Sequence, residues 1–286
     1  MKSRFIGDVA VSEIGLGACL LSNEGRPDEA QGIATIHAAL EAGVTLIDTA
    51  DAYALTDADF GHNETLVRRA LESHRAFSDD VVVATKGGHT RPGGNVWGID
   101  GRPEYLKRAC RDSLVRLGVS SIDLYQLHWP DPKVPYEESV GALKDLLDEG
   151  LIKRAGISNA DAGLIDVALE VLGGRLSSVQ NEFSISVRSR EAEVRLCRSR
   201  DVAFLAYQPL GGIGRAAGLG TRHSVLRRLA DSYGVSPQRV ALAWLLAKAP
   251  NIIPIPGSRR PATAVDSAKA GDLELAPEDL EALDLA

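Results

Sequence analysis

Short apolar runs alternate with amphipathic stretches along almost the whole chain, and this alternation strongly limits the folds open to it. Such apolar runs are typical of strands that are buried on both faces of a parallel sheet. We expect eight strands, at residues 14–18, 43–47, 81–84, 122–127, 152–157, 178–180, 202–206 and 251–253.

The amphipathic stretches between these runs predict helices. Three of them are followed by a glycine, the residue that most readily adopts the left-handed conformation of a C-terminal cap: Gly43, Gly118 and Gly150. Pro103 stands in the first turn of another, where the missing N–H breaks no helical hydrogen bond. The expected helices cover residues 28–42, 64–73, 103–117, 137–149, 162–172, 188–200 and 238–248.

Strand–helix alternation repeated this often predicts a parallel sheet, either open or closed into a barrel. About eight units, no dividing linker and a length close to the roughly 250 residues typical of such barrels favour closure. We therefore expect the α/β class, as a (β/α)8 TIM barrel in a single domain over residues 1–286, with extra C-terminal helices. Residues 4–13 predict an N-terminal β-hairpin that turns at Gly7–Asp8 and plugs the barrel bottom. A doubly wound open sheet is the alternative.

Composition excludes several classes of function. The net charge of −7 argues against a nucleic-acid partner, which would need clustered Lys and Arg. Three scattered cysteines, Cys19, Cys110 and Cys197, indicate neither a disulfide framework nor a zinc site. Charges at Asp8 and Glu13 interrupt any signal-peptide core, and no segment has the ~18 apolar residues of a membrane span. We expect a cytoplasmic protein that is a monomer or weak oligomer.

Polar side chains close or directly follow most of the predicted strands. In barrels of this kind the chemistry lies at the C-terminal ends of the strands, so these side chains should converge on one mouth. They are Asp48, Lys86, His128, Ser158, Asn159, Gln180, Asn181 and Tyr207, with Gly257, Ser258 and Arg259 in the last loop.

Seven segments in this same order resemble the aldo-keto reductase superfamily. The similarity covers nearly the full length, and the motifs are specific as a set although each alone would be weak. They are LIDTADAY at 46–53, ATK at 84–86, DLYQLHWPD at 123–131, GISN at 156–159, VQNEFS at 179–184, AYQPLGGIG at 206–214 and IPGSRR at 255–260.

The resemblance implies reduction of an aldehyde or ketone to an alcohol. Such a reaction needs a hydride, which no side chain can donate, and a proton from an acid within hydrogen-bond reach. By resemblance, Tyr53 is the general acid, and Lys86 is the amine that lowers its pKa. Asp48 is paired with Lys86, and His128 orients the substrate oxygen. His62, His74 and His89 have no such support and stay unassigned, with His89 a candidate for the pocket wall.

The resemblance also implies NADPH as the hydride donor. A Rossmann site fails, because Gly212–Gly214 follows a late strand and lacks the acidic residue expected ~20 positions further on. By resemblance, Ser158, Asn159 and Gln180 hold the nicotinamide, Tyr207 stacks on it, and Ser258 with Arg259 and Arg260 grips the 2′-phosphate. Asp266–Ser267 stands where the family often has Glu–Asn, so NADH is possible too. The remaining expected cofactor contacts are Gln208, Pro209, Leu210, Gly212, Gly257 and Asp266.

The substrate is expected to be a small carbonyl compound. Trp97, in the long loop 87–102, and Trp129 are predicted pocket walls, which favours an apolar or ring-bearing substrate. Two other functions compete with the reductase. Lys86 could be the Schiff-base nucleophile of a barrel aldolase, and the chain could be an NADPH-binding regulatory subunit with little turnover. No metal is expected, since the six histidines form no H-x-H or H-E-x-x-H pair.

Overall fold

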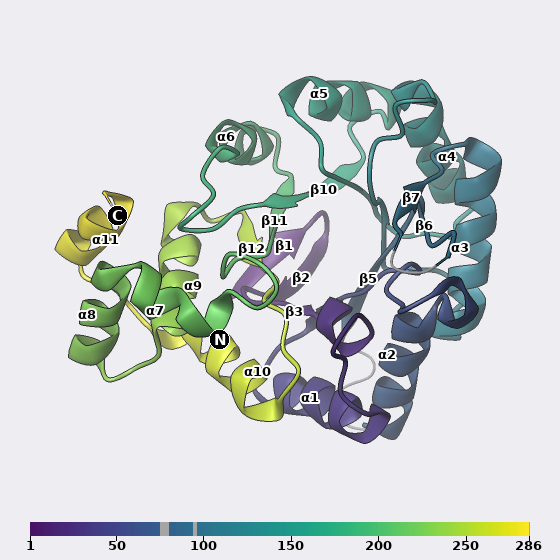
Figure 1. Ribbon diagram of the computed structural model, residues 1–286. Helices are drawn as coiled ribbons and strands as arrows, with labels where there is room; N and C mark the ends of the chain where they lie inside the picture. Colours follow the sequence, from purple (N-terminus) through teal and green to yellow (C-terminus); the bar gives the residue numbers. More distant parts are fainter. Residues whose placement is uncertain (75–79, 94–95, 286) are drawn as a thin grey trace.

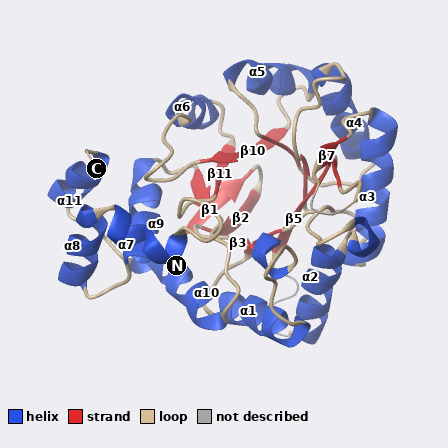
Figure 2. Ribbon diagram, in the orientation of Figure 1, coloured by secondary structure: helices blue, strands red, loops and turns tan. Residues whose placement is uncertain are grey.

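Eight parallel strands form one curled sheet that is ringed by helices (Figures 1 and 2). The computed structural model describes residues 1–74, 80–93 and 96–285. Neighbouring strands follow chain order from β3 to β12, as the (β/α)8 prediction requires. The strands are β3 (Leu16–Gly17), β4 (Leu46–Asp48), β5 (Val82–Gly87), β8 (Leu124–Leu127), β9 (Ala155–Ser158), β10 (Leu176–Glu182), β11 (Ala203–Tyr207) and β12 (Ile252–Pro254).

The sheet closes between its first and last strands. The N–H of Gly15 donates to the Pro254 carbonyl at 2.9 Å, and the N–H of Gly17 donates to the Pro256 carbonyl at 3.1 Å. Gly17 also forms a parallel bridge with Gly257. These contacts confirm the closed barrel and exclude the open doubly wound sheet.

Helices cover the outside of the barrel and carry the end signals read from the sequence. The Asp28 carboxylate accepts a hydrogen bond from the Gln31 N–H at the first helix, and Gly118 ends the third with φ 72°. The helices that follow the strands are α1 (Glu29–Glu41), α2 (His62–Ser73), α3 (Pro103–Leu117), α4 (Tyr136–Asp148), α5 (Ala162–Val171), α6 (Glu191–Ser199), α9 (Pro237–Lys248) and α10 (Pro261–Ala268).

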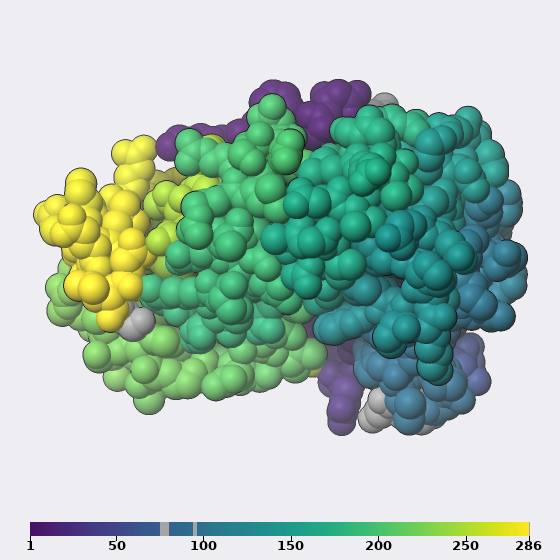
Figure 3. Space-filling view, turned by 90° about the horizontal axis from the view of Figure 1, so that it is seen from above, coloured from purple at the N-terminus to yellow at the C-terminus, as the bar shows by residue number. Residues whose placement is uncertain are grey.

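Three further helices lie at one side of the barrel. The helices α7 (Leu219–Arg222) and α8 (Ser224–Tyr233) come between β11 and α9, while α11 (Pro277–Asp284) ends the chain. The C-terminal segment forms one end of the molecule, yellow in Figure 3. Trp244 is fully buried and its indole N–H donates to Asp284 at 2.8 Å, which holds α11 against α9. Extra helices were therefore predicted correctly, although two of them precede the last strand.

The N-terminal hairpin is present as predicted. The strands β1 (Ser3–Ile6) and β2 (Val9–Ser12) pair antiparallel around Gly7–Asp8. Ile6 and Val11 are buried in a cluster with side chains from inside the barrel. The hairpin therefore closes the end of the barrel that lies away from the strand C-termini.

Strands β4 and β9 begin later than predicted. Strand β4 begins at Leu46 rather than at residue 43, because Thr45 bonds the hairpin: its N–H donates to Ser12 Oγ at 2.9 Å. Strand β9 begins at Ala155 rather than at 152. The loop at 87–102 contains a small antiparallel hairpin, β6 (His89–Thr90) with β7 (Gly98–Ile99), which the sequence analysis did not predict.

Closure of the barrel leaves no room for a side chain at Gly17. A Cβ there would lie 2.7 Å from the Ile255 carbonyl oxygen. We expect Gly17→Ala to lower the free energy of unfolding by about 1–3 kcal/mol, measured as a lower thermal midpoint. Gly141→Ala is the control, because its Cβ meets nothing within 4 Å. An equal effect of the two substitutions would contradict the steric argument.

Candidate active site

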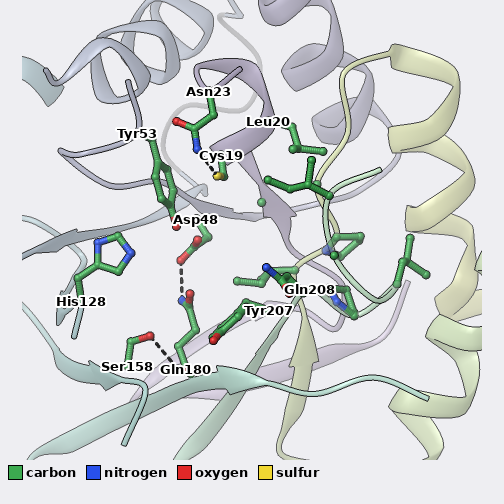
Figure 4. A pocket seen from close by; sticks show the side chains of 18 of the residues that line it. Cys19, Leu20, Asn23, Asp48, Tyr53, His128, Ser158, Gln180, Tyr207 and Gln208 are labelled. Atoms are coloured by element: carbon green, nitrogen blue, oxygen red, sulfur yellow. Dashed lines mark hydrogen bonds between the residues drawn. The ribbon is translucent and has the colours of Figure 1, made fainter. Parts of the chain in front are cut away.

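A cavity of about 370 Å³ opens at the C-terminal ends of the strands (Figure 4). It brings together most of the polar residues that the sequence analysis singled out, as the barrel rule requires. Of the predicted site residues, its walls include Asp48, Tyr53, Trp97, His128, Trp129, Ser158, Asn159, Gln180, Tyr207, Gln208, Pro209, Leu210, Gly212 and Gly257.

A buried ion pair lies at the base of this cavity. Lys86 is fully buried at the end of β5, and its Nζ donates to Asp48 Oδ2 at 2.6 Å. The same Nζ donates to the Thr49 carbonyl at 2.9 Å and to the Tyr53 hydroxyl at 3.1 Å. A buried ammonium requires such partners, and the expected pairing of Asp48 with Lys86 is present.

The pKa of Tyr53 moves in the opposite direction to the one the sequence analysis expected. Burial raises the pKa of its hydroxyl well above the ordinary value of 10, and Cys19 and Asp48 raise it further. The Asp48 carboxylate lies against the Lys86 ammonium and offsets its positive charge, so that desolvation decides the direction. Tyr53 is therefore a protonated phenol at neutral pH.

His128 stands beside Tyr53 as a neutral imidazole. The two rings meet edge to face, with centroids 5.6 Å apart. Burial lowers the pKa of His128 well below 6.5, and His89 and Lys86 lower it further. Its Nδ1 is buried and has no hydrogen-bond partner among the described residues. A proton on Nδ1 would be a buried donor without an acceptor, which favours the tautomer protonated on Nε2.

An aromatic group on the β6–β7 hairpin forms another wall. The His89 ring lies 4.2 Å from that of His128, 5.3 Å from that of Trp97 and 5.9 Å from that of Trp129, between centroids. Both tryptophans were predicted as walls and line the cavity. His89 was a candidate for the pocket wall without an assigned role, and it lines the cavity too.

Polar groups at the ends of β9, β10 and β11 are already bonded to one another. The Tyr207 hydroxyl donates to Asn159 Oδ1 at 2.7 Å, and the Asn159 amide donates to the His128 carbonyl at 3.0 Å. Ser158 Oγ donates to the Gln180 carbonyl at 2.8 Å, and Gln180 Nε2 donates to Asp48 Oδ1 at 2.8 Å. No described residue donates a hydrogen bond to Gln180 Oε1.

Two residues at this mouth have left-handed backbones. Asn159 has φ 60° and Gln208 has φ 48°, directly after β9 and β11. Asn tolerates this region, whereas Gln adopts it rarely, at a cost of order 1 kcal/mol. The glycines that follow, Gly211, Gly212 and Gly214, also have positive φ, so the loop after β11 turns sharply over the cavity.

The opposite wall comes from residues that the sequence analysis missed. Gly17, at the end of β3, and Cys19, Leu20 and Asn23, just after it, line the cavity. Burial raises the pKa of the Cys19 thiol to about 12, so it is neutral, and it accepts a hydrogen bond from Asn23 Nδ2 at 2.9 Å. The strand-end rule applied to the predicted strand at 14–18 would have found this segment.

Three predicted cofactor residues, Ser258, Arg259 and Asp266, lie outside the cavity walls. Arg259 Nη2 donates to the Glu24 carbonyl at 2.7 Å, while its buried Nε has no acceptor among the described residues. Asp266 is paired with Arg239 at 2.5 Å and also accepts from Ser236 Oγ. The structure thus engages both carboxylate oxygens of Asp266 in contacts at the start of α9.

A comparison with family models matches residues 13–286 to the aldo/keto reductase family. The chain belongs to this family. It is therefore an oxidoreductase, as the resemblance of its seven motifs predicted.

Individual relatives agree with this assignment. A 6-dehydroglucose reductase of Novosphingobium aromaticivorans is 34% identical over 270 residues, which cover 92% of this chain and 87% of that protein. The glycerol dehydrogenase structure from Gluconobacter oxydans has TM-score 0.84 and 29% identity, covering 99% of this chain and 94% of that one. An aldo/keto reductase structure from Klebsiella pneumoniae, in complex with NADP and acetate, has TM-score 0.81 and 30% identity, covering 99% and 93%.

The helices of this aldo/keto reductase are short. Within residues 1–74, 80–93 and 96–285, none combines the length and the apolar character needed to cross a bilayer.

The buried pair makes a prediction about stability. Lys86→Met leaves Asp48 buried with only amide donors, so the free energy of unfolding should fall by about 3 kcal/mol. Adding Asp48→Asn removes the stranded charge, so the double variant should be more stable than Lys86→Met alone. Urea unfolding of both singles and the double measures this coupling. Simple additivity of the two effects would contradict it.

Proposed function

We propose that this aldo/keto reductase reduces an aldehyde or ketone to an alcohol, with a hydride from NADPH and a proton from Tyr53. The observation that carries the proposal is the position of Lys86 Nζ, 2.6 Å from Asp48 and 3.1 Å from the Tyr53 hydroxyl, at the base of the cavity. A phenol in contact with a fixed ammonium suits proton transfer to a substrate oxygen.

Each side chain then has a defined task in the reduction. A carbonyl oxygen near Tyr53 and His128 receives hydrogen bonds from the phenol and from His128 Nε2–H. As that oxygen gains negative charge, the Tyr53 proton moves to it, and the Lys86 ammonium stabilises the resulting phenolate. Asp48 holds Lys86 in place. The raised pKa of Tyr53 keeps the proton on the phenol until the oxygen becomes basic enough to take it.

The rest of the cavity fits a nicotinamide cofactor, which supplies the hydride when bound. Gln180 Oε1 would accept from its carboxamide, beside Ser158 and Asn159, and Tyr207 would pack on its ring. The cavity extends to the loop after β11, where the glycine backbone is open. An anionic pyrophosphate would meet backbone N–H groups there. Gln208, Leu210 and Gly212 would supply these N–H groups, while Pro209, which has none, would line the same loop, with Gly257 opposite.

The unpartnered Nε of Arg259 supports NADPH rather than NADH. It is a buried donor without an acceptor among the described residues, and an Arg fork suits a 2′-phosphate. Ser258 lies next to it. Asp266 receives no cofactor contact in this proposal, because Arg239 and Ser236 already engage it. A single domain over residues 1–286 and a monomeric or weakly oligomeric cytoplasmic protein remain predictions.

Removal of the phenol hydroxyl tests the acid. We expect Tyr53→Phe to lower kcat for a reactive aldehyde by about 10²–10⁴-fold, because no other acid of the described site replaces it. Tyr136→Phe is the matched control: the Tyr136 hydroxyl is buried, has no hydrogen-bond partner among the described residues and lies away from the cavity. NADPH absorbance loss measures both variants. Unchanged turnover in Tyr53→Phe would refute the assignment.

Cofactor preference tests Arg259. We expect Arg259→Met to raise KM for NADPH roughly tenfold or more, the effect of losing a charged hydrogen bond to phosphate. KM for NADH should change far less, because NADH lacks that phosphate. Steady-state kinetics with both cofactors in wild type and variant give the two ratios. If both KM values rise equally, Arg259 supports the loop at Glu24 rather than the phosphate.

A further inference from the structure

His89 presents a hydrogen-bond acceptor to the substrate cavity. Its Nδ1 donates to the Gly98 carbonyl at 3.0 Å across the β6–β7 hairpin, and a carbonyl can only accept. The proton of the neutral ring therefore stands on Nδ1, which leaves Nε2 with a bare lone pair. Burial lowers the pKa of His89 below 6.5 and so favours this neutral form.

The Nε2 atom of His89 is free of protein partners. Among the described residues, no group donates to it, although the ring lines the cavity. The bond to Gly98 and the flanking rings of Trp97 and Trp129 hold the imidazole in one orientation. Trp97 is held in turn by the Arg91 guanidinium, 4.2 Å from its centroid. A fixed acceptor that is open to the cavity implies a donor on the molecule that fills it.

We propose that His89 Nε2 accepts a hydrogen bond from a substrate hydroxyl, which makes this chain selective for hydroxylated aldehydes and ketones. The inference rests on the proposed reductase function and names its substrate class. It assigns His89 as the residue that determines this selectivity.

The neighbouring imidazole fixes where that hydroxyl lies on the substrate. The His128 ring lies 4.2 Å from that of His89 between centroids. In the proposed reduction its Nε2–H donates to the carbonyl oxygen. The two imidazoles thus present a donor and an acceptor side by side. An α- or β-hydroxy carbonyl compound carries the complementary acceptor and donor at short separation. A hydroxyl far along a chain would not reach both rings, and a deoxy compound would leave Nε2 unpaired.

The test compares hydroxyacetone with methoxyacetone, in which a methyl group replaces the donor hydrogen and the ether oxygen stays. We expect wild type to prefer hydroxyacetone in kcat/KM by at least about threefold, as for one neutral hydrogen bond. His89→Phe should bring this ratio close to one, because it removes the acceptor and keeps an aromatic ring. His89→Gln, which keeps an amide oxygen, should retain part of the preference. His223→Phe, outside the cavity, should show the wild-type ratio.

The ratio of the two kcat/KM values is the readout, since loss of packing alone would lower both values together. Absence of a preference for hydroxyacetone in the wild type overturns the inference without any variant. A preference that survives in His89→Phe overturns it too. If the wild type reduces methoxyacetone but shows no preference, the reductase function stands and only the substrate class fails. If no carbonyl compound supports NADPH oxidation by the wild type, both the reductase function and the substrate class fail.

Discussion

The hydrogen bonds of one buried ammonium hold the reactive end of the barrel together. Lys86 Nζ has three protons, and Asp48, the Thr49 carbonyl and the Tyr53 hydroxyl accept all three. Because a buried ammonium with an unused donor is costly, any displacement of these acceptors is opposed by the full desolvation penalty. The position of Tyr53, on a loop beyond β4, is thereby fixed by an atom of β5.

The same network extends across the barrel through Asp48. Its second oxygen accepts from Gln180 Nε2 at 2.8 Å, which joins β4 to β10 on the far side of the mouth. The carboxylate is therefore satisfied from two directions, and the Gln180 amide can turn only one way, with Oε1 left for a ligand. The Asp48 carboxylate thus holds Lys86 beside Tyr53 and also orients the Gln180 amide. The proposed sites of proton and hydride transfer therefore depend on the same carboxylate.

The strand-end rule could predict this set from the sequence because the residues stand on the strands themselves. Asp48, Lys86 and Gln180 are placed by β4, β5 and β10, and buried parallel strands are readable as apolar runs. A pKa, in contrast, depends on the three-dimensional surroundings of the group and could not be predicted from the sequence. The pKa of Tyr53 was expected to fall, yet it rises, because burial and the carboxylate that neutralises Lys86 are properties of the folded site.

Residues carried by irregular segments were beyond the sequence for a related reason. His89 lies on a hairpin of two-residue strands, too short to give a periodic pattern. The ion pair of Asp266, on helix α10, with Arg239 is likewise a contact that no sequence motif shows. The two kinds of residue also divide the work. In the proposed reduction, Asp48 and Lys86 stand on strands that the barrel holds rigid, whereas His89, the proposed contact of the substrate hydroxyl, stands on a hairpin held by side chains. Arg91 links the two parts: it packs on Trp97 and donates to the Leu55 carbonyl at 2.8 Å, just beyond Tyr53. A substitution in the β6–β7 hairpin can therefore change which substrate hydroxyl is bound without moving Lys86, which supports the proposed acid Tyr53.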